Sequence, residues 1–182
     1  MEEKITIPHL GILVTTFCNL NCRNCSDLIP KRKSVNYDIK DVKEDMGRLL
    51  NEIDFIKEIL IIGGETLLYP QLDQIIDYCA AERKIGKIII TTNGTIIPRE
   101  EVLIACRNNC VKFEISNYSK TLPWIKERQD KLIRELNKYG ISYVLASEDG
   151  NWIDYGFDEV NNKIDEDYLI DIFDACHTPC RE

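Results

Sequence analysis

The sequence predicts an α/β fold built around a parallel β-sheet. Five short apolar runs rich in isoleucine, valine and leucine alternate along the chain with longer stretches that have the period of an amphipathic helix. The runs are nearly continuous in apolar residues, which is typical of strands buried on both faces of a parallel sheet. Five successive strand–helix units imply right-handed crossovers, so we expect either a partial barrel or a doubly wound sheet.

The individual elements follow from these patterns. The strands are expected at residues 10–16, 59–62, 87–92, 111–116 and 141–145. An apolar stripe at helical spacing predicts the first helix and consists of Ile39, Val42, Met46, Leu49 and Ile53. A second stripe predicts the next helix and consists of Leu72, Ile75, Ile76, Cys79 and Ala80. Prolines suit helix starts and glycine suits a helix C-cap, which places such boundaries near Pro70, Pro98, Pro123 and Gly140.

The composition is that of one soluble globular domain. Of 182 residues, 44% are hydrophobic and 30% are charged, and the net charge is -8 at pH 7. This acidic balance argues against a nucleic acid or an anionic membrane bound through a generally basic surface. No apolar run approaches the roughly 20 residues that span a bilayer, and the start of the chain lacks a signal-peptide pattern. We therefore expect a cytoplasmic protein; the sequence does not indicate its oligomeric state.

Three of the eight cysteines lie together after the first predicted strand and indicate a metal centre. A reducing compartment disfavours disulfides, and Cys18, Cys22 and Cys25 are separated by three and by two residues without a fourth cysteine nearby. Such a set can bind three corners of a cubane iron–sulfur cluster and leave the fourth iron open. The alternative is a structural zinc site completed by a distant ligand such as Cys176, His177 or Cys180.

Polar residues follow the next three predicted strands, where parallel α/β folds bind their ligands. Gly63-Gly64-Glu65 follows the second strand, Asn93 follows the third, and Ser116 ends the fourth. The two glycines allow close backbone approach and unusual dihedral angles, and a glutamate can accept a hydrogen bond from an ammonium group. Taken alone, Gly63-Gly64-Glu65 is more typical of a turn after a strand. Together with the cysteine loop, these residues predict a ligand site at one edge of the sheet.

The cysteine spacing followed by Gly63-Gly64-Glu65 resembles the radical S-adenosylmethionine (SAM) superfamily. The resemblance runs from the first predicted strand through the fifth, and it implies an α/β fold of the partial (β/α)6 TIM-like barrel type with a parallel sheet. It also implies that the three cysteines hold a [4Fe–4S] cluster. The residues that it implies for SAM binding are Gly63, Gly64 and Glu65 at the methionyl amine, and Asn93, Ser116 and Asn24 elsewhere on the cofactor. Asn24 replaces an aromatic residue that many members carry there.

The same resemblance implies the chemistry. A reduced cluster passes one electron to SAM, and the resulting 5′-deoxyadenosyl radical abstracts a hydrogen atom from the substrate. We expect a small-molecule or peptide substrate and a reductant such as flavodoxin or ferredoxin. Three alternatives remain open: a glycyl-radical enzyme activase, a non-catalytic iron–sulfur module, and a zinc-stabilised binding domain.

The predicted organisation is a core domain over residues 1–165 and a cysteine-containing C-terminal tail over residues 166–182. Cys176 and Cys180 resemble the opening of a tail that carries an auxiliary cluster in some radical SAM proteins. Five strand–helix units are predicted where the superfamily usually has six. The chain is therefore expected to be either truncated or a natural minimal form.

Overall fold

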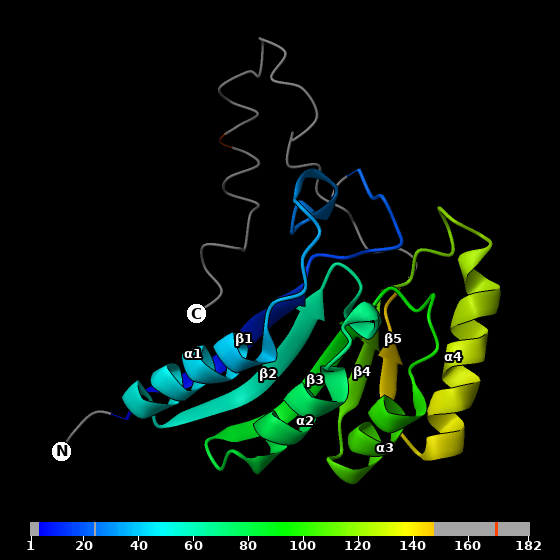
Figure 1. The fold of residues 1–182 in the computed structure, drawn as a ribbon. Helices are drawn as coiled ribbons and strands as arrows, with labels where there is room; N and C mark the ends of the chain where they lie inside the picture. The colour runs from blue at the N-terminus through cyan, green and yellow to red at the C-terminus, as the bar shows by residue number, and fades with distance from the viewer. Residues whose placement is uncertain (1–3, 24, 148–169, 171–182) are drawn as a thin grey trace.

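A computed structural model of the chain describes residues 4–23, 25–147 and 170 (Figure 1). Within these ranges five β-strands alternate with four α-helices. The strands are β1 (Thr6–Thr15), β2 (Phe55–Gly63), β3 (Ile85–Thr92), β4 (Lys112–Ile115) and β5 (Tyr143–Leu145). The helices are α1 (Ile39–Glu52), α2 (Leu72–Ala81), α3 (Glu100–Asn108) and α4 (Ile125–Tyr139). Two short 3-10 helices, η1 (Ile29–Lys31) and η2 (Thr66–Leu68), follow β1 and β2.

The strands form one parallel sheet in the order β1-β2-β3-β4-β5. A doubly wound sheet reverses its strand order at an internal switch point, so the sequential order excludes that alternative. Helices α1 to α4 lie along one side of the sheet in Figure 1, as right-handed crossovers that all run in one direction require. The predicted α/β fold is therefore confirmed in its barrel-type form. The described ranges contain five of the six strands expected for a (β/α)6 barrel.

The first three strands begin earlier than the apolar runs predict, at residues 6, 55 and 85. The residues that the apolar runs omit include two polar side chains, His9 of β1 and Glu58 of β2. His9, Glu58 and Lys87 are aligned across β1, β2 and β3, and Glu58 pairs with His9 at 3.1 Å and with Lys87 at 2.9 Å. A continuous apolar run marks only the part of a strand that is buried on both faces, so these half-exposed ends were missed.

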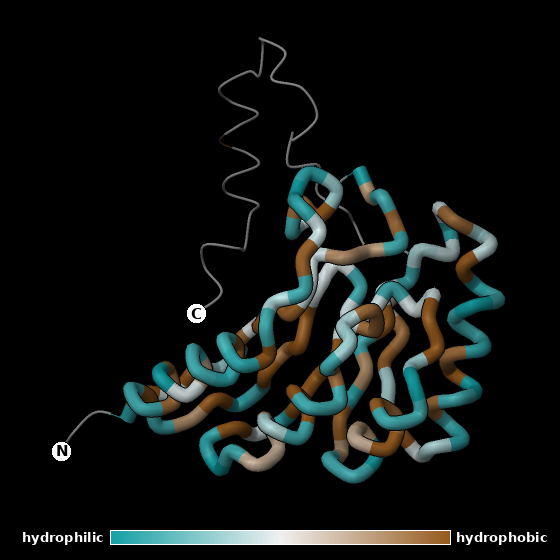
Figure 2. The backbone as a smooth tube through the Cα atoms, viewed as in Figure 1, coloured by the Kyte–Doolittle hydropathy of each residue, from teal (hydrophilic) through white to brown (hydrophobic). Residues whose placement is uncertain are grey.

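The hydrophobic core lies between the sheet and the helix layer. Figure 2 shows hydrophobic strands behind helices whose outward sides are largely hydrophilic. The predicted apolar stripes of α1 and α2 pack into this core, except for Ala80, which is exposed because it lies at the edge of its stripe. Pro70, Pro98 and Pro123 each stand two residues before a helix, and Gly140 caps α4 in the left-handed conformation with φ 68°. No helix in the described ranges has both the length and the hydrophobicity that crossing a membrane requires.

Candidate functional site

The cysteine loop leaves β1 and is held at its base by two buried threonines. The Thr16 backbone N–H donates to the carbonyl oxygen of Val35 at 2.8 Å, and the Val35 N–H donates to Thr16 Oγ1 at 2.8 Å. Thr15 Oγ1 donates to Asn36 Oδ1 at 2.6 Å. These bonds join residues 35–36, where the loop ends, to residues 15–16, where it begins. The cysteine loop is therefore anchored at the carboxyl end of β1.

Gly63 and Gly64 bring the end of β2 into contact with the start of this loop. The Gly64 N–H donates to the carbonyl oxygen of Thr15 at 2.9 Å, and the Glu65 N–H donates to that of Phe17 at 2.8 Å. A Cβ atom on Gly64 would lie 2.5 Å from the Phe17 carbonyl oxygen. The predicted close approach is therefore confirmed. The predicted unusual dihedral angles are not, because neither glycine has a positive φ.

A Gly64→Ala substitution should displace the cysteine loop. The added methyl group would press on backbone atoms of Phe17, and such overpacking costs about 1–3 kcal/mol. We expect lower thermal stability and less iron retained after reconstitution. The matched control is Gly47→Ala, where the nearest atom to the new Cβ is 3.8 Å away and alanine should stabilise helix α1 by about 0.5–1 kcal/mol. Equal iron contents in the two variants would show that the close approach at Gly64 does not shape the site.

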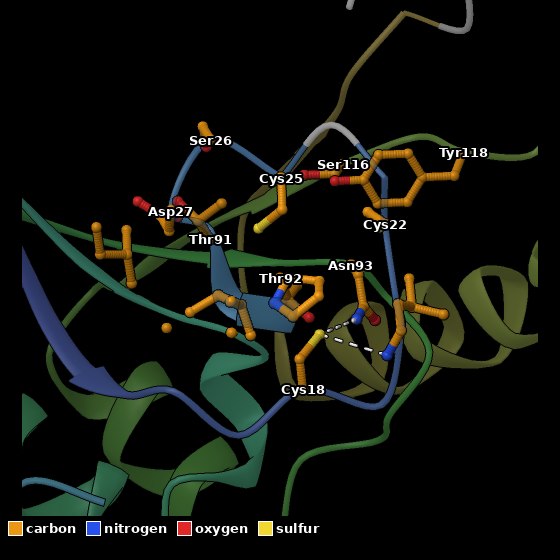
Figure 3. A pocket seen from close by; sticks show the side chains of 16 residues that line it. Cys18, Cys22, Cys25, Ser26, Asp27, Thr91, Thr92, Asn93, Ser116 and Tyr118 are labelled. Carbon is orange, nitrogen blue, oxygen red and sulfur yellow. Dashed lines mark hydrogen bonds between the residues drawn. The ribbon is translucent and has the colours of Figure 1, made fainter. Parts of the chain in front are cut away.

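The three cysteines surround one cavity at the carboxyl ends of β1 to β4 (Figure 3). The cavity has a volume of about 180 Å³. Its walls are the cysteine loop, the glycine pair and the ends of β3 and β4, contributing Cys18, Cys22, Cys25, Gly63, Gly64, Thr91, Thr92, Asn93 and Ser116. The strand-end residues that the sequence singled out are thus brought together in space, apart from the Glu65 side chain, which does not line the cavity.

The three thiols are candidate ligands for a metal group in this cavity. In the described ranges, no three His, Cys, Asp or Glu side chains lie close enough together to hold a single metal ion. A cubane cluster needs three thiolates that each bind a different iron atom. Three half-buried thiols around a cavity fit that group. Burial raises the pKa of Cys18 and of Cys22, so the metal-free chain keeps both as thiols at neutral pH.

Two hydrogen-bond donors point at the sulfur of Cys18. The backbone N–H of Leu20 lies 3.4 Å from it and the side-chain amide of Asn93 lies 4.0 Å from it (Figure 3). The same Asn93 amide donates to Asn19 Oδ1 at 3.0 Å, and Asn19 in turn donates to Thr95 Oγ1 at 2.7 Å. Asn93 therefore lines the cavity and also orients the cysteine loop, and its contact with SAM stays a prediction. Donors to a ligating sulfur help to set the potential of an iron–sulfur cluster.

Glu65 is buried, with 1% of its surface exposed, and it joins β2 to β3. One carboxylate oxygen accepts hydrogen bonds from the Leu67 N–H at 3.0 Å and from Thr92 Oγ1 at 2.7 Å, and the other accepts from the Asn93 N–H at 2.8 Å. Burial raises the pKa of this carboxyl group, and the three donors act in the opposite direction. These contacts support a role in positioning the end of β3. Direct contact between the Glu65 carboxylate and SAM stays a prediction.

Sequence reasoning missed three residues that shape the site. Gln129 of α4 is buried and donates to the carbonyl oxygens of Ser116 at 2.7 Å and of Asn93 at 3.2 Å, which ties the ends of β3 and β4 together. Tyr118 lines the cavity beside Cys22, and burial raises its pKa to about 12, so it remains a protonated phenol. Asp27 also lines the cavity. The sequence does carry a signal for two of them. Asp27 lies two residues after Cys25, and Tyr118 lies two residues after Ser116 at the end of the fourth predicted strand.

Several predicted residues lie outside the described ranges. These are Asn24, the expected adenine contact, and the tail residues Cys176, His177 and Cys180. Their roles stay predictions, as do the boundary at residue 165 and the zinc alternative that uses the tail.

The sequence of this chain matches a known protein family. The profile of the family described as "Radical SAM superfamily" matches residues 12–117, which is more than half of the chain. This chain belongs to the radical SAM superfamily. The matched range contains the cysteine loop, the glycine pair and the ends of β2 to β4, so the membership covers every wall of the cavity except Tyr118.

Two named relatives are similar in sequence to about half of this chain. A GTP 3′,8-cyclase from Syntrophomonas wolfei subsp. wolfei is 36% identical over 98 residues, which are 52% of this chain and 29% of that protein. A GTP 3′,8-cyclase from Stenotrophomonas maltophilia is 34% identical over 97 residues, with the same two coverages. The chain therefore matches less than a third of the length of these radical SAM relatives.

Two solved structures have a similar fold. Streptococcus suis SuiB bound to S-adenosylmethionine matches 93% of this chain and 38% of its own, with a TM-score of 0.62 and 20% identity. The protein anSMEcpe with bound AdoMet matches 76% of this chain and 42% of its own, with a TM-score of 0.59 and 20% identity. At these identities the likeness concerns the fold alone. It agrees with the barrel-type order of the sheet.

Proposed function

We propose that this chain is a radical SAM enzyme that binds a [4Fe–4S] cluster and cleaves SAM reductively. The observation that carries the proposal is the single cavity bounded by three cysteine thiols on one side and by Gly63 and Gly64 on the other. Three thiolates leave one iron of a cubane cluster without a protein ligand. A cavity beside that iron is where a small chelating ligand can bind.

The chain's own residues have distinct tasks in this proposal. Cys18, Cys22 and Cys25 hold the cluster, and the backbone of Gly63 and Gly64 receives the methionyl amine at the cavity wall. When bound and reduced, the cluster and SAM together supply a 5′-deoxyadenosyl radical, which takes a hydrogen atom from the substrate. Asn93 and Glu65 hold the end of β3 against the cysteine loop, so that the walls of the cavity keep their positions.

Tyr118 and Ser116 close the cavity on the side of β4. A protonated Tyr118 can donate a hydrogen bond there, and its partly buried ring helps to exclude water from the cavity. Exclusion of water protects a reactive intermediate from side reactions. Ser116 supplies a second hydroxyl group for the bound SAM molecule, as the resemblance implies.

We propose a small molecule or a peptide as the substrate. The relatives named GTP 3′,8-cyclase support a small molecule, since their name gives a nucleotide. A solved structure of SuiB bound to the precursor peptide SuiA, with a TM-score of 0.62, supports a peptide. The cavity of about 180 Å³ has room for only part of such a molecule, so the substrate would extend beyond it.

The direct test is SAM cleavage by the reconstituted chain. After anaerobic reconstitution with iron and sulfide, reduction with dithionite and addition of SAM should give 5′-deoxyadenosine and methionine in equal amounts. Chromatography with mass spectrometry measures both products. A well-formed, reducible cluster that yields neither product would contradict the proposal and favour the non-catalytic iron–sulfur module. A protein that retains zinc and no iron would favour the zinc-stabilised domain.

A further inference from the structure

A second hollow lies on the outer side of the cysteine loop. It has a volume of about 550 Å³ and lies between residues 19–23 of the loop and residues 118–124, which lead into α4. Leu20, Cys22 and Tyr118 line both this hollow and the cluster cavity. These three residues therefore border both hollows, and one of them, Cys22, is a proposed cluster ligand.

Trp124 stands between this hollow and a third one. The third hollow, of about 520 Å³, is lined by Trp124 together with Thr95, Ile97, Glu127, Arg128 and Lys131. The side chains of Trp124 and Ile97 are large and apolar, yet 50% and 48% of their surfaces are exposed. The Arg128 guanidinium lies 5.5 Å from the centre of the Trp124 ring. We call the two hollows and the residues between them the Trp124 surface.

The Trp124 surface has the opposite charge to the molecule as a whole. Its charged lining residues are Arg23, Arg128, Lys131 and one acid, Glu127, which pairs with Lys131 at 2.8 Å, so the lining carries two more positive charges than negative ones. The whole chain has 23 basic and 31 acidic residues and a net charge of -8. The net charge of the chain repels an acidic protein, whereas the excess of positive charge in this lining attracts one. Apolar and aromatic groups at the centre with charges around them are typical of protein interfaces, where aromatic and arginine residues carry much of the binding.

We propose that the Trp124 surface docks a small acidic electron-transfer protein that reduces the cluster. The donor's flavin or iron–sulfur centre loses one electron and the cluster gains one. The proposal rests on the proposed function, since it needs a cluster at Cys22. It follows from three features of the surface: its excess of positive charge on an acidic molecule, its half-exposed Trp124, and the three lining residues, Cys22 among them, that it shares with the cluster cavity.

The test compares a protein reductant with a chemical one. Arg128→Gln/Lys131→Gln removes two positive charges from the Trp124 surface and keeps side chains that suit a helix. The matched control, Lys40→Gln/Lys57→Gln, removes the same charge from exposed residues on α1 and β2, near the β1 edge of the sheet and away from α4. Trp124→Ala removes the apolar centre. Each reconstituted protein is assayed for 5′-deoxyadenosine with reduced flavodoxin, with reduced ferredoxin and with dithionite.

We expect both Trp124-surface variants to form product about tenfold more slowly with the protein reductants at an ionic strength of about 0.01 M, because electrostatic steering changes association rates by 10-fold or more. The deficit of the charge variant should shrink at about 0.5 M salt, where charges are screened. With dithionite, rates should stay within twofold of the unmodified protein, and the control should match it with every reductant. Isothermal titration of flavodoxin or ferredoxin into each protein should show weaker binding by both Trp124-surface variants than by the control and the unmodified protein.

Three results would overturn the docking proposal. They are equal affinity for the electron carriers in the Trp124-surface variants and the control, an equal loss of rate with dithionite, and no binding of either carrier by the unmodified protein. Failure of the proposed function looks different, because the unmodified protein would then form no 5′-deoxyadenosine even with dithionite. In that case the titrations still decide whether the Trp124 surface binds these proteins.

Discussion

Replacement of Cys22 by alanine should abolish SAM cleavage while the chain stays folded. Cys22 is half-buried on a loop, and its thiol lines the cavity rather than the hydrophobic core. Its loss removes one of three proposed iron ligands, and a cubane cluster held by two thiolates is expected to be lost. The unfolding free energy of the metal-free chain should change by less than about 1 kcal/mol, as for most substitutions outside the core. Formation of 5′-deoxyadenosine should fall below detection, together with the bound iron and the visible absorbance of the cluster.

Cys110→Ala is the matched control for this prediction. Cys110 is an exposed free cysteine just after α3, far along the chain from the site, and alanine keeps the same Cβ at its positive φ of 53°. This variant should retain iron and product at the level of the unmodified protein. A Cys22→Ala protein that kept a full cluster and its activity would show that another residue supplies the third ligand. Loss in both variants would indicate general damage to the chain rather than a role of Cys22.

The composition of the site could be predicted because a parallel sheet collects its strand ends. Gly63, Asn93 and Ser116 are far apart in sequence, yet each follows a buried strand, and parallel strands end at the same edge. The apolar runs were enough to place those ends within a residue of their positions in the structure. The three cysteines followed in the same way, from a loop that begins where β1 ends. Strand order was left open by the sequence, because local patterns do not say which strands are neighbours.

The hydrogen bonds that hold the site could not be predicted. Gln129 lies on the buried side of α4, and its partners are carbonyl oxygens 13 and 36 residues away. Nothing in the local sequence distinguishes it from a solvent-exposed polar residue of a helix. Asn19 likewise reaches Thr95 across 76 residues. Such contacts depend on how elements pack, which is set by the whole fold rather than by the period of any one segment.

The contacts of the Glu65 carboxylate also depend on how elements pack, because two of its three donors lie at the end of β3. Glu65→Ala should lower the unfolding free energy of the chain by about 3 kcal/mol or more. The substitution leaves the buried N–H groups of Leu67 and Asn93 without their acceptor, and each unsatisfied buried donor costs about 1–3 kcal/mol. Domains of this size have a stability of about 5–15 kcal/mol, so the loss should be plain in urea unfolding of the metal-free chain.

The same variant should lose SAM cleavage at least a hundredfold, because the end of β3 carries Asn93, which orients both Asn19 and Cys18. Glu52→Ala, at an exposed position of α1, should change neither property and serves as the control. The two roles considered for Glu65 predict different patterns. If the carboxylate only bound the methionyl amine of SAM, Glu65→Ala would weaken SAM binding, and the unfolding free energy of the metal-free chain would match that of the control. A positioning role requires stability and cleavage to fall together, since a structure loosened at β3 changes the cavity before any cofactor enters it.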